Sequence, residues 1–388
     1  MTDYLKLKEQ LIAYSKEIGV DKIGFTTADP FTELKSQLRR QQELGYQSGF
    51  EEKNIKKRTE PTLLMEKAQS IIAIAMAYPK KMAERLPNRT GHRRGAFARV
   101  SWGLDYHVIL RGRLQKLGEY LVRAVPGAKY KSMVDTGELS DRAVAERAGI
   151  GWVGKNTNLI TKEFGSYVYL GEMLTTIPFP PDKPAADLCG DCTICVDHCP
   201  TRALIQGGQL NSHRCIAYLT QTKQELPEQY KKALGNRLYG CDTCQQVCPY
   251  NRDVDSHFHP EMEPDPELAR PLLTPLLSLS NREFKETYGP LSGSWRGKKP
   301  IQRNAIVALG NYKETAAAPE LVRLLGKDPR PVIRRTVTWA LQQMWDRIEP
   351  RLRTKIVQSL EKLLATETDE KVYQWIEERL NMEKRRQK

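Results

Sequence analysis

All eight cysteines of the chain lie in one short segment, between Cys189 and Cys248. The first four follow the spacing C-x2-C-x2-C-x3-C, and Pro200 comes directly after them. A second group consists of Cys241, Cys244 and Cys248, and it is also followed by a proline. In such runs three closely spaced thiolates bind one [4Fe–4S] cubane, and the fourth cysteine binds the other cluster of a pair. The spacing therefore predicts a compact segment folded around two cubanes.

The number of cysteines matches the number of ligands that two cubanes require, which is eight. The second group lacks one cysteine of the full run, and Cys215 is the only one left to complete it. The first cluster is expected to bind Cys189, Cys192, Cys195 and Cys248. The second cluster is expected to bind Cys199, Cys215, Cys241 and Cys244.

Zinc is the main alternative, because paired Cys-x-x-Cys sequences also form closed tetrahedral zinc sites. Zinc does not account for the proline after both runs, whereas the cubane spacing accounts for every cysteine. Disulfides are disfavoured, because we see no secretory segment at the start of the chain and disulfides belong to oxidising compartments. We therefore expect reduced thiols and a cytoplasmic protein.

The length and charge of the chain limit the possible partners. Its 388 residues are enough for two or three domains with their own cores. The longest strongly apolar run, residues 71–77, is too short to span a bilayer, so no membrane association is expected. The net charge is +14, and residues 296–388 contribute +9, from 21 Lys and Arg against 12 Asp and Glu. Such a charge favours nucleic acid as a partner, although a basic, solvated helical surface is the alternative.

The patterns along the chain predict an α+β multidomain protein with three domains. Residues 1–185 mix helical and strand patterns, with expected strands at 22–26, 70–77, 131–134 and 167–175. Residues 186–255 hold the cysteines and should form a ferredoxin-like domain with two [4Fe–4S] clusters. Residues 256–388 comprise a proline-rich linker and a helical region.

The helical region contains a weak internal repeat. The sequence of residues 304–309 recurs at 336–341, with Asp328-Pro329 marking a turn between them. This punctuation is typical of HEAT repeats, which stack into a solenoid. A plain helical bundle is the alternative. In either case Arg303, Arg323, Arg334 and Arg335 could share one face.

Three short matches between residues 135 and 156 do not fit their usual functions. Residues 149–154 match G-x-G-x-x-G, but they follow a helical pattern rather than a strand, which argues against a dinucleotide site. The same stretch lacks the Ser or Thr of a P-loop, because Asn156 stands there. Asp135-Thr136-Gly137 matches the aspartic-protease triplet, but that chemistry needs two such carboxylates.

The same segment is rich in glycine, which permits close backbone approach to a large flat ligand. Lys155 and Asn156 offer hydrogen-bond donors to such a ligand. Asp135 follows a short apolar strand, where partial desolvation would raise the pKa of a carboxyl and suit it to donate a proton. The alternative for Asp135 is a turn or helix-capping carboxylate.

Taken with both cysteine runs, these stretches resemble the epoxyqueuosine reductase family. The similarity extends over nearly the whole chain and is carried by residues 101–107, 134–137, 145–157, 170–172, 214–220 and 235–241. One position departs from the family pattern, because Leu104 stands where the family has arginine. The role of that arginine in the family is therefore not carried over to this chain.

The resemblance implies an enzyme that reduces the epoxide of epoxyqueuosine, at the wobble position of tRNA, to the alkene of queuosine. It implies a cobalamin in the N-terminal α/β domain as well as the two [4Fe–4S] clusters. The partners would be a tRNA anticodon stem-loop and an external electron donor such as flavodoxin or ferredoxin. Nothing in the sequence requires more than a monomer.

The resemblance also implies roles for individual residues. Asp135 would donate the proton to the departing oxygen and face the cofactor, and His107 would be structural because the cobalt has no histidine ligand. The polar rim of the corrin would be held by Arg58, Lys155 and Asn156. The tRNA phosphates would be bound by Arg296, Lys298, Lys299, Arg303, Arg334 and Arg335.

Two other functions are compatible with the cysteines. A ferredoxin-type electron carrier would not need the 185 residues that precede the clusters. A dehalogenase-like corrinoid iron–sulfur reductase is the second alternative. We disfavour it, because such enzymes usually carry export signals and because the basic C-terminal region suits RNA better than a small substrate.

Overall fold

The computed structural model describes residues 3–84 and 86–386. Its contacts divide the chain into two compact units, each made of three segments. The first unit comprises Met1–Met82, Trp102–Cys215 and Asp242–Pro264. The second comprises Ala83–Ser101, Ile216–Cys241 and Asp265–Lys388. Among the described residues we find no helix with the length and apolarity that a membrane crossing requires.

These units differ from the predicted division at residues 185 and 255. The cysteine segment is shared between the units, because residues 186–215 and 242–255 pack with the N-terminal residues while 216–241 pack with the C-terminal helices. The proline-rich linkers in the sequence could not predict this division of the cysteine segment. Prolines mark where helices and strands end, but they do not show which segments pack together.

A four-stranded antiparallel sheet forms the centre of the first unit, in the order β1-β2-β7-β4. Its strands are β1 (Lys22–Thr27), β2 (Ser70–Ala77), β7 (Val168–Thr175) and β4 (Tyr130–Met133). All eight residues of β2 are buried, as expected for an apolar run in a central strand. The four strands predicted from the sequence are therefore confirmed, with small shifts at their ends.

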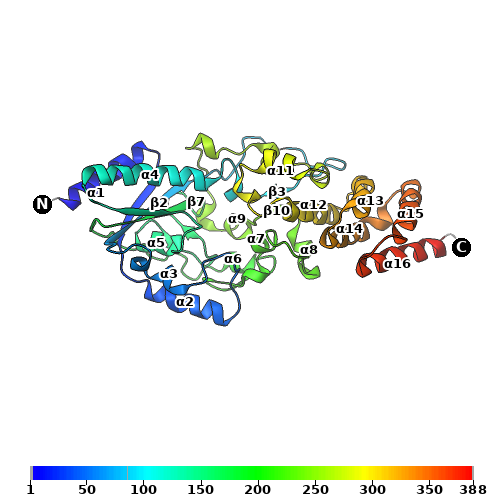
Figure 1. The fold of residues 1–388 in the computed structure, drawn as a ribbon, viewed down its shortest axis with the longest axis horizontal. Coiled ribbons are helices and arrows are strands. Elements are labelled where there is room, and N and C mark those ends of the chain that lie inside the picture. Colours follow the sequence, from blue (N-terminus) through cyan, green and yellow to red (C-terminus); the bar gives the residue numbers. More distant parts are fainter. Residues whose placement is uncertain (1–2, 85, 387–388) are drawn as a thin grey trace. The chain divides into compact units, whose positions relative to one another are not determined.

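Helices cover both faces of this sheet (Figure 1). One face packs against α4 (Tyr106–Ala124), which in turn contacts α1 (Tyr4–Glu17). The other face packs against α5 (Asp141–Arg147), with α2 (Thr32–Glu43) and α3 (Ile55–Thr59) nearby. Gly171 of β7 allows α4 to lie close, because a Cβ there would be 3.1 Å from a methyl carbon of Leu114.

Short elements form the cysteine segment of the first unit. The hairpin of β5 (Trp152–Val153) and β6 (Leu159–Ile160) precedes it. The segment itself contains α6 (Ile194–Asp197), the hairpin of β8 (Leu204–Gln206) and β9 (Gln209–Leu210), and α9 (Thr243–Gln246). Helices α6 and α9 contact each other, and each ends shortly before the proline that follows its cysteine run. Proline cannot continue a helix, which accounts for these two stops.

The second unit is mainly helical. Its first elements are β3 (Ala96–Phe97), α7 (Ile216–Leu219), α8 (Glu228–Leu234), β10 (Arg237–Tyr239), α10 (Pro266–Ala269) and α11 (Asn281–Tyr288). Strand β10 pairs with β3 in parallel. Five longer helices follow, namely α12 (Lys298–Tyr312), α13 (Ala318–Lys327), α14 (Pro331–Met344), α15 (Pro350–Leu364) and α16 (Glu370–Arg386).

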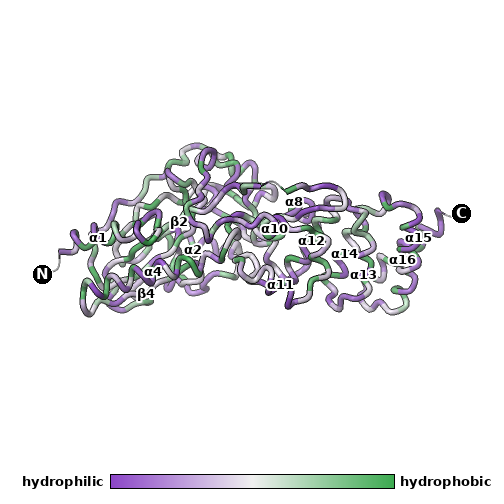
Figure 2. The backbone as a smooth tube through the Cα atoms, turned by 90° about the horizontal axis from the view of Figure 1, so that it is seen from above, coloured by the Kyte–Doolittle hydropathy of each residue, from purple (hydrophilic) through white to green (hydrophobic). Residues whose placement is uncertain are grey.

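These five helices pack as HEAT-like repeats, as predicted. Contacts join α12 with α14, α13 with α15, and α14 with α16, so helices two apart lie side by side. Gly310 of α12 permits this packing, because a Cβ there would lie 3.0 Å from Cα of Ala340 in α14. Proline opens α14 and α15, where a missing backbone N–H costs nothing. Figure 2 shows that α15 and α16 are mostly hydrophilic in colour.

Candidate active site and cluster-binding segment

Asp135 lies in the loop that follows β4, at the end of the central sheet. Its φ is +50°, in the left-handed region, which only a few non-glycine residues adopt. The backbone N–H of Asp135 donates to Oδ2 of Asp141 at 2.8 Å, which fixes this turn against the start of α5. The side chain of Asp135 is 63% exposed, so its carboxylate can meet a ligand.

The imidazole of His107 joins Asp135 to a second carboxylate. Its Nδ1 lies 2.7 Å from Oδ1 of Asp105, and its Nε2 lies 3.5 Å from Oδ2 of Asp135. Asp105 also caps α4, because its Oδ1 accepts the backbone N–H of His107 at 3.0 Å. Burial opposes the charge of the ring, but the hydrogen bond to Asp105 and the ion pair with Asp135 outweigh it and raise the pKa of His107 to about 9. The ring is therefore a cation at neutral pH.

This contact corrects one prediction. The interaction with the His107 ring lowers the pKa of Asp135 and outweighs the effect of burial, so the predicted rise is wrong. His107, which we expected to be structural, lies at ion-pair distance from the predicted acid. The sequence did contain a signal for the Asp105–His107 pair. His107 follows Asp105 by two residues, and Asp105 is the N-cap of α4, so both side chains lie at the same end of this helix.

Further charged groups surround this pair. Burial, followed by the charge of Asp135, raises the pKa of Asp141 to about 6. Burial raises the pKa of Glu172, in β7, well above its usual value. Arg142 of α5 donates to the carbonyl of Thr157, and its charge acts on both Asp135 and Asp141.

Arg58 belongs to the same group. Burial lowers the pKa of its guanidinium, and its charge interacts with Glu51, Arg142 and Asp141. The structure thus brings the charge of Arg58 close to Asp141 and Arg142 at the start of α5, although these residues are far apart in the sequence.

Lys155 and Asn156 have different surroundings, although they are adjacent. The ammonium of Lys155 donates to the carbonyl of Gly190 at 2.5 Å, so this side chain supports the cysteine segment. Asn156 is 3% exposed, and its Oδ1 accepts the backbone N–H of Asn158 at 3.1 Å. Its Nδ2 is buried and has no hydrogen-bond partner among the described residues. A buried donor of this kind is costly unless a ligand accepts from it, so Asn156 fits the role of a cofactor contact.

The four predicted ligands of the first cluster lie together. The thiols of Cys248, Cys189 and Cys192, after burial, raise the pKa of Cys195, which shows that all four are neighbours. Cys248 also packs against Trp152 and Ile160 of the β5–β6 hairpin. This grouping agrees with the assignment made from spacing alone.

Two of the expected ligands of the second cluster receive N–H groups at sulfur. Burial raises the pKa of Cys199, but backbone N–H donors outweigh it, and that of Ala203 lies 3.2 Å from Sγ. Nδ2 of Asn158 lies 3.9 Å from Sγ of Cys244. Such donors stabilise cluster thiolates. Among the described residues, no group of three or more His, Cys, Asp or Glu side chains could hold a single metal ion. A cubane does not need such a group, because each of its four thiolates binds a different iron.

Residues 58–136 match a family described as epoxyqueuosine reductase QueG, DUF1730, and residues 188–251 match a 4Fe–4S double cluster binding domain. Residues 297–381 match HEAT repeats. An epoxyqueuosine reductase of Bacillus cereus is 61% identical over 370 residues, covering 95% of this chain and 96% of the relative. That of Bacillus subtilis is 57% identical over 377 residues, covering 97% and 96%. This chain belongs to the epoxyqueuosine reductase family.

Solved structures agree with this assignment. A crystal structure of epoxyqueuosine reductase with an epoxyqueuosine-modified stem loop of tRNA-Tyr has a TM-score of 0.92 and 57% identity, covering 98% of this chain and 99% of that one. A structure from Bacillus subtilis, with an aspartate-bearing catalytic loop swung out of the active site, has a TM-score of 0.92 and 56% identity, with the same coverage.

The arginines expected to bind tRNA in this epoxyqueuosine reductase are partly structural. Arg303 is 1% exposed, and its guanidinium donates to the carbonyls of Leu219, Thr222 and Gln224 at 2.6–2.8 Å. It cannot reach a phosphate without unfolding this part of the unit, so its predicted role is wrong. The periodic pattern placed Arg303 on a helix, but it could not show that the helix is buried on nearly every side.

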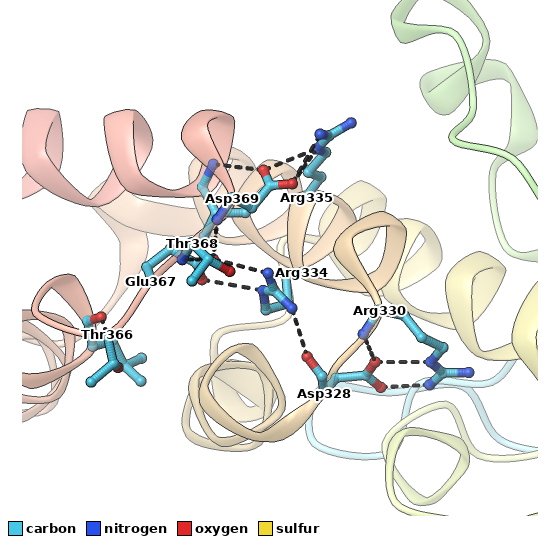
Figure 3. A network of polar contacts seen from close by, with 10 residues as sticks. Asp328, Arg330, Arg334, Arg335, Thr366, Glu367, Thr368 and Asp369 are labelled. Atoms are coloured by element: carbon cyan, nitrogen blue, oxygen red, sulfur yellow. Dashed lines mark hydrogen bonds and ion pairs between the residues drawn. The ribbon is translucent and has the colours of Figure 1, made fainter.

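Arg334 and Arg335 are held in a network of ion pairs (Figure 3). Arg334 lies 2.9 Å from Glu367, with both side chains nearly buried, and Arg335 lies 2.9 Å from Asp369. These pairs tie α14 to the turn that precedes α16, so both guanidinium groups already have carboxylate partners and are less available to a phosphate. Arg323, expected on the same face, pairs with Glu320.

The remaining basic candidates lie at the start of α12. Nζ of Lys298 donates to the carbonyl of Leu279 at 2.6 Å, and Arg296 lies over the ring of Trp295. Lys299 is half-buried, with no carboxylate within ion-pair distance among the described residues. Lys299 is therefore the candidate most available to a phosphate.

Proposed function

We propose that this enzyme reduces epoxyqueuosine to queuosine at the wobble position of tRNA, with two [4Fe–4S] clusters and a cobalamin. The observation that carries the proposal is the contact of Asp135 with the His107 cation at an exposed edge of the sheet. The chain aligns over nearly its full length with proteins named epoxyqueuosine reductase. One solved structure of such a protein contains an epoxyqueuosine-modified tRNA stem loop, which supports the choice of substrate.

The reaction requires a proton source at the departing oxygen. Removal of an epoxide oxygen breaks two C–O bonds, forms a C=C bond and consumes two electrons and two protons, with water as the second product. An alkoxide is a poor leaving group at neutral pH, so an acid must act on it. The His107–Asp135 pair carries one proton at neutral pH, because the pKa of His107 is about 9. Asp135 is exposed and delivers this proton, while Asp105 holds the imidazole in place.

Cobalamin fits the residues near this pair. When bound, it supplies a cobalt centre that can take electrons one at a time and act on carbon. Asn156 would hold its polar rim through the unpartnered Nδ2, and Arg58 would contribute a positive charge beside α5. Lys155 is a weaker candidate, because its ammonium is already bound to Gly190. The swung-out aspartate loop of the Bacillus subtilis relative supports a role for the loop of Asp135.

The other partners follow from charge and redox chemistry. Lys299, Lys298 and Arg296 would bind tRNA phosphates, which favour clustered cations. Electrons would come from an external donor such as flavodoxin or ferredoxin, and the protein would act in the cytoplasm as a monomer.

Conversion of a defined RNA tests the proposal. The protein is reconstituted anaerobically with iron, sulfide and cobalamin, reduced chemically, and mixed with a stem-loop that carries epoxyqueuosine. Mass spectrometry of the released nucleosides should show queuosine, and omission of cobalamin should abolish it. A fully loaded protein that leaves epoxyqueuosine intact would overturn the proposal.

A further inference from the structure

Trp295 presents a large aromatic ring at the surface of the second unit, just before α12. It is 54% exposed, although tryptophan is on average a well-buried residue in folded proteins. An exposed indole forgoes the stabilisation that burial of its apolar area would give, so the fold gains nothing by leaving it in solvent. A single exposed ring is ordinary on a protein surface. What distinguishes this one is how it is held and which charges surround it.

The indole is held in place by Gln221, which follows α7 by two residues. Nε1 of Trp295 donates to Oε1 of Gln221 at 2.9 Å, and Nε2 of Gln221 donates to the carbonyl of Ala217 at 2.8 Å. The backbone carbonyl of Gln221 accepts Nε of Arg296 at 3.2 Å. Gln221 therefore anchors both neighbouring side chains, so little conformational freedom remains to be lost when a ligand binds to them.

The loop that carries the ring is anchored as well. The backbone N–H of Gly293 donates to Oγ of Ser101 at 3.0 Å, which ties the turn before Trp295 to another segment of the same unit. After the ring, Gly297 has a φ of +80°, a conformation that glycine adopts readily, and the chain then enters α12. The ring therefore stands on a fixed turn between two ordered parts of the unit.

Positive charge surrounds the ring. The guanidinium carbon of Arg296 lies 4.9 Å from the centre of the Trp295 ring. Lys298 and Lys299 follow in the first turn of α12, which contains no acidic residue. The N-terminus of α12 has no side-chain cap, so its backbone N–H groups add the positive end of a helix dipole to these three cations.

An aromatic ring among cations suits an unpaired nucleotide. The base can stack on the ring, because every base has a π-face, while its phosphates meet the adjacent cations. A docking protein would instead need further apolar area around the ring. Among the described residues of the second unit, the other large apolar side chains that are exposed are Tyr373 and Met382. Both lie on α16, at the other end of the row of helices that α12 opens (Figure 1).

We propose that Trp295 is the stacking platform for one unpaired base of the tRNA anticodon loop. The inference rests on the proposed function, which supplies the RNA. Arg296 and the two lysines bind the phosphates on either side of that base. Stacking releases no counterions, so the ring contributes affinity that persists when salt screens the cations.

Binding of the epoxyqueuosine-modified stem-loop to the cluster-loaded protein tests this role. Trp295→Ala should weaken binding about tenfold, as expected for one stacked base, and Trp295→Phe should keep most of the affinity. The loss in Trp295→Ala should be the same at low and moderate salt, whereas the effect of removing Lys298 and Lys299 should shrink as salt rises. Trp295→Leu, which is apolar but has no π-face, serves as a second test where the alanine variant does not fold.

Phe258→Ala is the matched control for the loss of an exposed ring. Phe258 belongs to the first unit and is 59% exposed, but no Lys or Arg lies within five positions of it in the sequence. This variant should bind the stem-loop like the parent. A loss in Phe258→Ala equal to that in Trp295→Ala would overturn the assignment of the platform to Trp295.

Abasic nucleotides identify the base that stacks. Each loop nucleotide is replaced in turn, and the affinity of each RNA is measured for the parent and for Trp295→Ala. One replacement should weaken binding to the parent about tenfold and leave binding to Trp295→Ala unchanged, because the two changes remove the same contact. Additive losses at every position, or parent affinity in a folded Trp295→Ala protein, would overturn the inference. A parent that binds the stem-loop without converting it would count against the proposed reaction alone, and a parent that does not bind it would overturn both.

Discussion

Nε2 of His107 lies 3.5 Å from Oδ2 of Asp135, so an imidazolium holds the acid loop of the site. The contact has two effects. It keeps a proton beside an exposed carboxylate at neutral pH, and it ties the loop after β4 to the start of α4. Loss of the proton from His107 would remove the charge that holds the loop.

Replacement of His107 by Gln should lower stability in a pH-dependent way. The pKa of His107 is raised from 6.5 to about 9 in the folded protein, so the ring stabilises the fold fully below pH 6.5. This contribution is lost as pH rises through about 9. The free energy of unfolding of His107→Gln should fall short of the parent by at most about 3.4 kcal/mol near pH 6, from 1.36 kcal/mol per pKa unit.

Urea unfolding at several pH values measures this difference. The deficit of His107→Gln should shrink steadily between pH 6.5 and about 9. A deficit that stays constant across this range would mean that the ring contributes packing and not charge.

Cluster content should depend on individual cysteines in two separate sets. Anaerobically reconstituted protein should hold about eight irons and eight sulfides per chain. Cys248→Ala should damage the first cluster and Cys215→Ala only the second, because each cluster needs its own four thiolates. Iron analysis and electron paramagnetic resonance of both variants check this. Stoichiometric zinc, without broad visible absorption, would contradict the assignment.

The basic residues of the second unit should divide into two classes. Lys298→Ala with Lys299→Ala should weaken binding of the stem-loop roughly tenfold at low salt and reduce the salt dependence, because phosphate contacts release counterions. Arg303→Met should instead cost about 3 kcal/mol of stability, because it leaves several buried carbonyls without donors.

Titration of RNA binding against salt, with thermal unfolding of each variant, separates the classes. Lys299→Ala alone should unfold like the parent, whereas the double variant should lose only about 1 kcal/mol, from the hydrogen bond of Lys298 to Leu279. Full affinity in the double lysine variant would show that the start of α12 is not a docking surface.

Cobalamin affinity should fall when Asn156 is replaced by Leu. The change removes the buried N–H that lacks a protein partner, so cobalamin binding should weaken about tenfold. It also removes the acceptor of the Asn158 N–H, so the apoprotein should lose about 1 kcal/mol of stability. Asn158→Leu is a suitable control, because Asn158 lies toward Cys244 instead. Equal cobalamin affinity in parent and Asn156→Leu, measured by titration in visible light, would remove Asn156 from the site.

Local patterns predicted much of this molecule. The cysteine spacing predicted which thiols lie close to Cys195 in the structure, because cluster ligands follow one another at short intervals in a sequence. Their binding of a cluster stays a prediction. The apolar run of β2 predicted a buried strand, because its length and its isoleucines are typical of a strand buried on both faces.

Long-range contacts were beyond the sequence. The buried state of Arg303 depends on three carbonyls about 80 residues earlier in the chain. The pKa of Asp135 falls because His107, on another element, lies beside it, whereas the sequence showed only the apolar strand before it. In the sequence, Glu172 is only one residue of the stretch that resembles the family. Its position between Ala73 of β2 and Met133 of β4 follows from the strand register, which the sequence did not predict.

The rate of single-turnover conversion in Asp135→Asn tests the account most directly. Asparagine keeps the size of the side chain but cannot carry the proton held by the His107 pair. Clusters, cobalamin and stem-loop affinity should remain at parent levels, while conversion of epoxyqueuosine falls by roughly 10²-fold or more. A folded, fully loaded Asp135→Asn protein that converts the stem-loop at the parent rate would contradict the role of Asp135 as proton donor.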